Sequence, residues 1–168
     1  MATVTVGSAS VTRTISGNSP QILTLPEAAS QTFKKGELVY LSAGYVTEIG
    51  ANPAYILGMA AEDAHNDDNA GTHNVAVYLA NNDTIFEIHK TDSSGSGAAT
   101  AVTDVGREFA IYRDTTNSWV TAYISGVGAG ANARLMCLDH SGKDTVGDTG
   151  GRLLVVVTGS FRQLFCTS

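Results

Sequence analysis

Residues 54–90 read AYILGMAAEDAHNDDNAGTHNVAVYLANNDTIFEIHK and contain the clearest strand pattern in the chain. From position 75 to position 80, two series of apolar residues alternate with a period of two, as in a strand that is packed on both faces. The Asn-Asn-Asp triplet at positions 81–83 tolerates a left-handed backbone and therefore favours a turn. These features predict a β-hairpin in which residues 84–89 return antiparallel to residues 75–80.

Further strand pairs are predicted on both sides of this stretch. Residues 37–41 and 45–49 surround a loop that ends at Gly44, a residue suited to positive φ. Residues 106–112 and 118–124 surround a polar loop in the same way. Hairpins are therefore expected to recur along the chain.

Single residues refine this pattern. Gly58 lies inside the expected strand 54–60 and indicates a bulge or a close approach of another backbone. The valine-rich run 152–158 is typical of a strand in the middle of a sheet. Pro26 stands in the position that favours one helical turn over residues 26–30.

The overall pattern predicts an all-β fold. No window of eleven residues places apolar side chains at the spacing of an amphipathic helix, so long helices are not expected. Eight to ten short strands at turn spacing predict a compact β-barrel or β-sandwich of short antiparallel strands.

The chain length of 168 residues is typical of one domain. We expect residues 21–168 to form this single β domain and residues 1–20 to form an extended N-terminal arm. The arm is rich in β-prone residues but weakly patterned. It is compatible with a mobile segment that adds a strand to a partner's sheet, and equally with a first edge strand of the domain itself.

Composition and charge disfavour several classes of partner. The net charge is −6, and the ten basic residues are dispersed from Arg13 to Arg162, so direct nucleic-acid binding is not expected. No apolar run is long enough to span a bilayer, and the first residues lack the pattern of a secretory signal, so we expect synthesis in the cytoplasm and no membrane partner. Cys137 and Cys166 lack metal-ligand spacing and are interpreted as buried apolar residues, with one disulfide as the alternative.

The loop before position 74 contains carboxylate and imidazole side chains that are potential cation ligands. The spacing lacks the glycine and the distant glutamate of a calcium loop, so a solvated surface loop is the preferred interpretation. The residues concerned are Glu62, Asp63, His65, Asp67, Asp68 and His73.

Asp139, His140 and Ser141, with Asp144 and Asp148 nearby, include the residue types of a hydrolytic triad. Residues adjacent in sequence do not have the geometry of such a triad, and no strained elbow surrounds the serine. An ordinary turn is the preferred interpretation. We therefore predict no catalytic, cofactor-binding or metal-binding residues, although a hydrolase that uses these three residues remains a testable alternative.

Two other patterns have simple structural interpretations. Glycines at 126, 128 and 130 lack a following helix and a phosphate-binding lysine, so a flexible loop is expected. Trp119, Thr121 and Tyr123 share one face of a predicted strand, where core packing is preferred over a sugar-stacking platform.

Three segments in succession carry a resemblance to a known family. Residues 33–44 have the pattern Phe-x-x-Gly-x-x-Val-x-Leu-x-x-Gly, residues 56–64 read ILGMAAEDA, and residues 75–77 read Val-Ala-Val and are followed by a returning strand with Phe86. This succession resembles the core of the head decoration, or cement, proteins of tailed bacteriophages. The likeness covers about residues 33–112 and consists of strand and glycine spacings. The segment from Trp119 onward has no counterpart in it.

The resemblance implies a small β-barrel or β-sandwich protein without enzymatic activity. Such a protein adds to the outer surface of an expanded capsid, bridges major capsid subunits, often forms a homotrimer and is part of the virion. The N-terminal arm makes the capsid contact in some such proteins. The corresponding candidates here are Thr3, Val4, Thr5, Val6, Val11, Thr12 and Arg13. The alternative is a carbohydrate- or receptor-binding β-module of a phage head fibre or tail.

Overall fold

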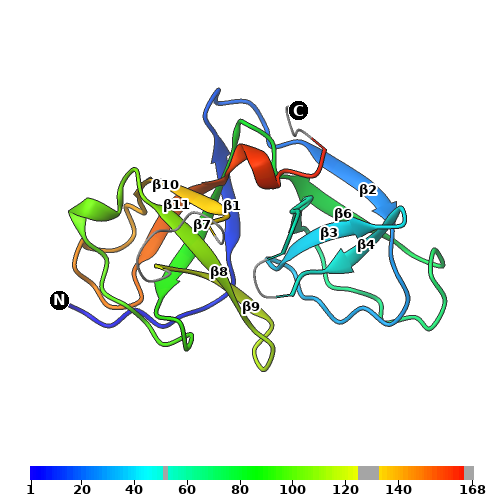
Figure 1. The fold of residues 1–168 in the computed structure, drawn as a ribbon, viewed down its shortest axis with the longest axis horizontal. Helices are drawn as coiled ribbons and strands as arrows, with labels where there is room; N and C mark the ends of the chain where they lie inside the picture. Colours follow the sequence, from blue (N-terminus) through cyan, green and yellow to red (C-terminus); the bar gives the residue numbers. More distant parts are fainter. Residues whose placement is uncertain (51–52, 125–132, 165–168) are drawn as a thin grey trace.

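A computed structural model describes residues 1–50, 53–124 and 133–164. The described chain is built from β-strands and two short 3₁₀ turns (Figure 1), neither of which is long or apolar enough to cross a lipid bilayer. The strands are β1 (Ser10–Thr14), β2 (Ile22–Pro26), β3 (Leu38–Ser42), β4 (Tyr45–Glu48), β5 (Gly58–Ala60), β6 (Asn74–Leu79), β7 (Thr84–Thr91), β8 (Glu108–Asp114), β9 (Trp119–Tyr123), β10 (Leu135–His140) and β11 (Arg152–Val157). The 3₁₀ turns are η1 (Val102–Asp104) and η2 (Gly159–Phe161).

The first sheet closes into a barrel. Its strand order is β1-β7-β11-β10-β8-β9, and a parallel pairing of β9 with the end of β7 completes the circle. β11, the valine-rich strand, lies between β7 and β10, which confirms its predicted central position. β1 pairs antiparallel with the first half of β7, so residues 10–14 form the edge strand that was the alternative to a mobile arm.

The second sheet has the order β2-β6-β5-β3-β4. It curls, because Glu27 just after β2 makes a parallel bridge with Val46 in β4. Its concave side holds an apolar cluster that includes Phe33, Val39 and Val77.

The two sheets share one core. The larger apolar cluster combines barrel residues such as Phe86 and Phe109 with Leu38 and Met59 of the second sheet. Alternate residues of β3 therefore contact different clusters, as a strand buried on both faces requires. Arg113 of β8 adds ion pairs to Glu37 and Glu48, each with a nitrogen–oxygen distance of 3.1 Å.

The predicted hairpin between residues 75–80 and 84–89 is wrong. β6 and β7 belong to different sheets, because β2 and β5 occupy both edges of β6 while β7 is buried along its whole length in the barrel. The Asn81 side-chain oxygen accepts hydrogen bonds from the backbone N–H of Asp83 and of Thr84 at 2.9 and 2.8 Å. Residues 81–83 therefore turn the chain from one sheet into the other.

The other two predicted hairpins are confirmed. β3 and β4 pair around Ala43 and Gly44, which both have positive φ (50° and 88°), as a two-residue I′ turn requires. β8 and β9 pair antiparallel along their length.

Gly58 is a site of close backbone approach, as predicted. A Cβ atom at this position would lie 1.9 Å from the carbonyl oxygen of Tyr78. The helical turn expected over residues 26–30 is wrong, because Pro26 ends β2 and the next residue continues as the bridge to β4.

Candidate functional site

The N-terminal candidate residues are attached to the barrel. The backbone N–H of Val4 donates to the carbonyl of Thr149 at 2.8 Å, and Thr3 forms a parallel bridge with the same residue. The backbone N–H of Ala2 donates to the Asp148 carboxylate at 2.7 Å. The segment before β1 is therefore held in place by the loop that precedes β11.

The candidates divide by burial into an anchored set and a presented set. Val4 and Val6 are half-buried, and Val11 packs against the larger core cluster. The exposed members are Thr3, Thr5, Thr12 and Arg13. The polar members of the group are therefore the ones available to a partner.

Next to this segment, the outer face of β7 carries the buried carboxylate of Glu87. Glu87 accepts a hydrogen bond from the Ser141 hydroxyl at 2.7 Å and from the Lys143 ammonium at 2.8 Å, and the Arg152 guanidinium lies 3.7 Å away. Burial acts to raise the pKa of Glu87, but the hydrogen bonds and positive charges outweigh it and hold the pKa below its usual value. Glu87 therefore remains an anion in the folded protein.

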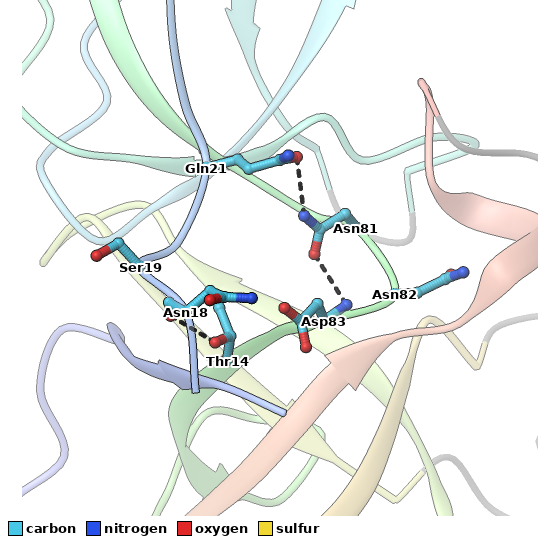
Figure 2. A pocket seen from close by; sticks show the side chains of 7 residues that line it. All are labelled: Thr14, Asn18, Ser19, Gln21, Asn81, Asn82 and Asp83. Carbon is cyan, nitrogen blue, oxygen red and sulfur yellow. Dashed lines mark hydrogen bonds between the residues drawn. The ribbon is translucent and has the colours of Figure 1, made fainter. Parts of the chain in front are cut away.

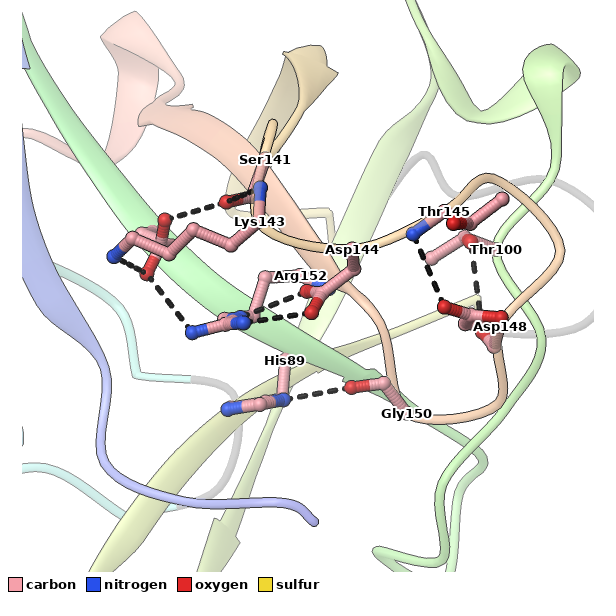
Figure 3. Close-up of polar contacts among 10 residues, drawn as sticks. His89, Thr100, Ser141, Lys143, Asp144, Thr145, Asp148, Gly150 and Arg152 are labelled. Carbon is pink, nitrogen blue, oxygen red and sulfur yellow. Dashed lines mark hydrogen bonds and ion pairs between the residues drawn. The ribbon is translucent and has the colours of Figure 1, made fainter. Parts of the chain in front are cut away.

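The loop over this face is fixed by a second ion pair (Figure 3). Arg152 donates from Nε and Nη2 to the Asp144 carboxylate at 2.7 and 2.6 Å. These bonds lower the pKa of Asp144 and raise that of Arg152. His89 contacts the carbonyl of Gly150 through Nδ1 at 2.7 Å, so the loop is attached to β7 at both ends.

Asp139, His140 and Ser141 do not form a triad in this structure. The Ser141 hydroxyl is bound to Glu87, and His140 Nε2 lies 2.9 Å from the carbonyl of Ala101. The Asp139 carboxylate accepts from the backbone N–H of His140 at 2.8 Å. Each of the three groups therefore has a different local partner.

A shallow groove lies between β1 and the end of β10. One part has a volume of about 380 Å³, and the adjoining part about 650 Å³. Arg13, Asp139 and Leu154 line both parts, so the groove combines an apolar floor with charges of both signs. The presented residue Thr12 also lines the smaller part.

A separate polar pocket lies where the chain crosses between the sheets (Figure 2). Its volume is about 300 Å³, and its walls are hydroxyl, amide and carboxylate side chains. The Asn81 amide donates to Gln21 Oε1 at 3.1 Å, and the Thr14 hydroxyl donates to the carbonyl of Asn18 at 2.5 Å. The lining residues are Thr14, Asn18, Ser19, Gln21, Asn81, Asn82 and Asp83.

The loop with potential cation ligands is organised by hydrogen bonds. His65 Nδ1 lies 2.7 Å from the buried carboxylate of Glu27, and the His65 ring stacks on His73 with centroids 4.3 Å apart. His73 Nε2 lies 3.5 Å from Asp67. Among the described residues, no group of three or more acidic, histidine or cysteine side chains has the arrangement of a metal site.

The remaining candidates are the strand at residues 119–123, the two cysteines and the glycine loop. Thr121 is buried and shares a 2.7 Å hydroxyl contact with Thr91, while Trp119 and Tyr123 on the same face are half-buried. The core packing expected for these two aromatic residues is wrong, because Val120 and Ala122 on the opposite face of the strand contact the larger apolar cluster. Cys137 is a buried free thiol, and burial, with the charge of Asp104, raises its pKa to about 11. The glycine loop at 125–132 and Cys166 lie outside the described residues.

Sequence reasoning missed the buried ion pairs. Besides Glu87, the Lys90 ammonium lies 2.8 Å from both carboxylate oxygens of Asp104 inside the barrel. A signal was present, because residues 84–91 place charged or histidine side chains on both faces of an otherwise apolar strand. Buried charges of this kind require partners.

Comparison of the sequence with family models and with curated proteins identifies no relative. No protein-family model matches the chain, and no curated protein sequence matches it significantly.

Proposed function

We propose that this protein is a non-enzymatic component of a bacteriophage virion that binds the outer surface of the capsid and bridges major capsid subunits. The observation that carries the proposal is the attached N-terminal segment, which presents Thr3, Thr5, Thr12 and Arg13 on a stiff barrel edge. The strand and glycine spacing of residues 33–112 supports the same role.

The polar groups of the barrel are consistent with a passive brace. Glu87, Asp144 and Asp104 are each held by a basic partner within the chain. A brace requires a rigid core and a broad polar contact, since the modest contacts of many copies add through multivalency. In this role the protein acts as repeated copies, with a homotrimer as the expected unit.

The test uses empty mature heads of the parent phage. We expect the purified protein to bind these heads and to raise the temperature at which they come apart. Arg13→Glu should weaken binding several-fold, because it reverses the charge at the presented edge. Lys35→Glu makes the same charge change on an exposed loop of the second sheet and is the matched control. Equal binding by both variants would exclude the proposed edge, and no binding of the wild type would exclude the function.

A glycan-binding module is the second candidate, favoured by the pocket in Figure 2. Its amide and hydroxyl walls have the chemistry that recognises sugar hydroxyls. If this candidate holds, a glycan array gives reproducible hits that Asn82→Ala weakens. An array without hits would remove it.

A further inference from the structure

β2 lies along the outside of the second sheet (Figure 1), and among the described strands it pairs only with β6. Two of its apolar side chains are exposed, Ile22 by 50% and Leu23 by 39%. Exposed edge strands with apolar side chains are templates for pairing with another chain.

The ladder with β6 determines which main-chain groups point outward. The backbone N–H of Leu79 donates to the carbonyl of Gln21, and that of Glu27 donates to the carbonyl of His73. Hydrogen-bonded and non-hydrogen-bonded pairs alternate along an antiparallel ladder. The backbone N–H and C=O groups of the odd-numbered residues of β2 therefore point toward β6. The N–H and C=O groups of Ile22 and Thr24 therefore point away from the sheet.

Prolines frame this outward edge. Pro20 and Pro26 each stand three residues from Leu23, and both have even numbers. Neither has an N–H to donate, so pairing is limited to the residues between them. Beyond Pro26 the chain turns to β4, where Glu27 bridges Val46.

This framed edge is symmetric about Leu23. We propose that β2 pairs antiparallel with β2 of a second copy of this chain, with Leu23 on the two-fold axis. Ile22 of each copy then lies opposite Thr24 of the other, and each such pair exchanges two main-chain hydrogen bonds. The same two-fold operation places Pro20 of one copy opposite Pro26 of the other. Neither residue has an N–H group, so no donor is left without an acceptor at this position.

The Leu23 side chains of the two copies contact each other at the two-fold axis. The N–H and C=O of Leu23 face β6, so the two Leu23 residues form a non-hydrogen-bonded pair, in which Cα atoms approach to about 4.5 Å and side chains contact closely. Leu23 lies opposite Val77 and shares the concave face of the sheet. Pairing therefore brings together the two exposed Leu23 side chains at the edges of the two sheets.

A second copy fits this edge better than an unrelated strand. An unrelated strand has no reason to repeat the spacing of prolines around a central leucine, whereas another β2 does so necessarily. The contact is a short strand pair, smaller than the interface of a stable dimer, so it forms at high concentration or between copies held side by side on a surface. It does not depend on the proposed capsid function.

The first test exploits the axis through Leu23. Leu23→Glu and Leu23→Lys each place like charges opposite one another, so each variant alone should fail to pair. An equimolar mixture of the two should restore pairing, because opposite charges then meet. Sedimentation over a concentration series is expected to give wild type and mixture a larger limiting mass than either variant alone, twice as large if the unpaired protein is a monomer. A mass equal to that of the single variants in both cases would overturn the proposal.

The second test measures register by cross-linking. With Cys166 replaced by serine, Leu23→Cys should form a disulfide-linked dimer under mild oxidation, and Ile22→Cys should form far less, because Ile22 faces Thr24 of the second copy. Thr24→Pro removes only an outward N–H and should abolish the dimer while circular dichroism stays unchanged. Equal cross-linking at positions 22 and 23, or a dimer that survives Thr24→Pro, would contradict this register.

Discussion

The barrel and the second sheet are stabilised differently. The barrel encloses a buried ion pair, because the side chains of Lys90 and Asp104 are exposed by only 7% and 1% and lie 2.8 Å apart. The cluster enclosed by the second sheet is formed by apolar side chains such as Phe33, Val75 and Leu79. The barrel therefore combines its apolar cluster with a buried ion pair, whereas the cluster enclosed by the second sheet is apolar and is closed by the backbone approach at Gly58.

The difference shows where sequence changes should matter. A buried ion pair needs both partners, and here they come from β7 and η1, segments joined by a long polar loop. An apolar cluster tolerates changes in shape better than a buried charge tolerates the loss of its partner.

The largest effect is expected for Asp104→Ala. It leaves the Lys90 ammonium buried without its carboxylate and also removes the acceptor of the Ala101 N–H. Breaking a buried pair in this way costs about 3–5 kcal/mol of unfolding free energy. Urea unfolding followed by tryptophan fluorescence measures the loss.

The control for this prediction replaces both partners. Lys90→Met combined with Asp104→Leu removes the two charges together, so the double variant should be more stable than Asp104→Ala alone. Equal stability of the two proteins would show that the ion pair is not what the barrel depends on.

In the second sheet, the corresponding test is Gly58→Ala. The added methyl group would lie 1.9 Å from the carbonyl oxygen of Tyr78, so β5 and β6 must separate. Overpacking of this kind costs about 1–3 kcal/mol. Thermal unfolding measures the cost, and Gly142→Ala, where the same atom meets nothing within 4 Å, is the matched control. An equal effect at both positions would argue against the close approach.

A smaller and pH-dependent effect is expected for Glu87→Gln on the outer face of the barrel. The folded pKa of Glu87 lies below its usual value of 4.5, so the anion stabilises the fold above pH 4.5 and this contribution is lost as pH falls toward the folded pKa. The variant should lose about 1.5 kcal/mol near pH 7, the lower end of the range for a hydrogen bond to a charged group, because the glutamine oxygen can still accept. Its stability should approach that of the wild type in acid. A difference that is constant between pH 7 and pH 3 would contradict the role of charge.

The two β-hairpins could be predicted from the sequence, whereas the β6–β7 crossover could not. The β3–β4 and β8–β9 turns are specified by residues inside the turn, such as Gly44, so they were predictable. The Asn-Asn-Asp segment is equally compatible with a hairpin and with a crossover. Only the occupied edges of β6 and β7, which depend on strands distant in sequence, distinguish the two.

The candidate site was predictable only in part. Thr12 and Arg13 are exposed, but their choice as capsid contacts follows from the resemblance and stays a prediction. The partners of Glu87 could not be predicted, because Lys143 lies 56 residues away and no local pattern links the two. Ion pairs between distant segments become visible only in the folded structure.

The smallest effect is expected for Lys34→Ala on the surface of the second sheet. Lys34 and Asp63 lie 3.2 Å apart, but their side chains are 56% and 55% exposed, so water and salt screen the pair. Such pairs contribute about 0–1 kcal/mol, and Asp63 keeps its hydrogen bond from the Lys35 backbone. Urea unfolding at low salt should show a loss of at most this size, and the loss should shrink further at high salt. A loss as large as that of Asp104→Ala would mean that exposure does not separate the two ion pairs, and the distinction between the halves of the molecule would then have to rest on topology alone.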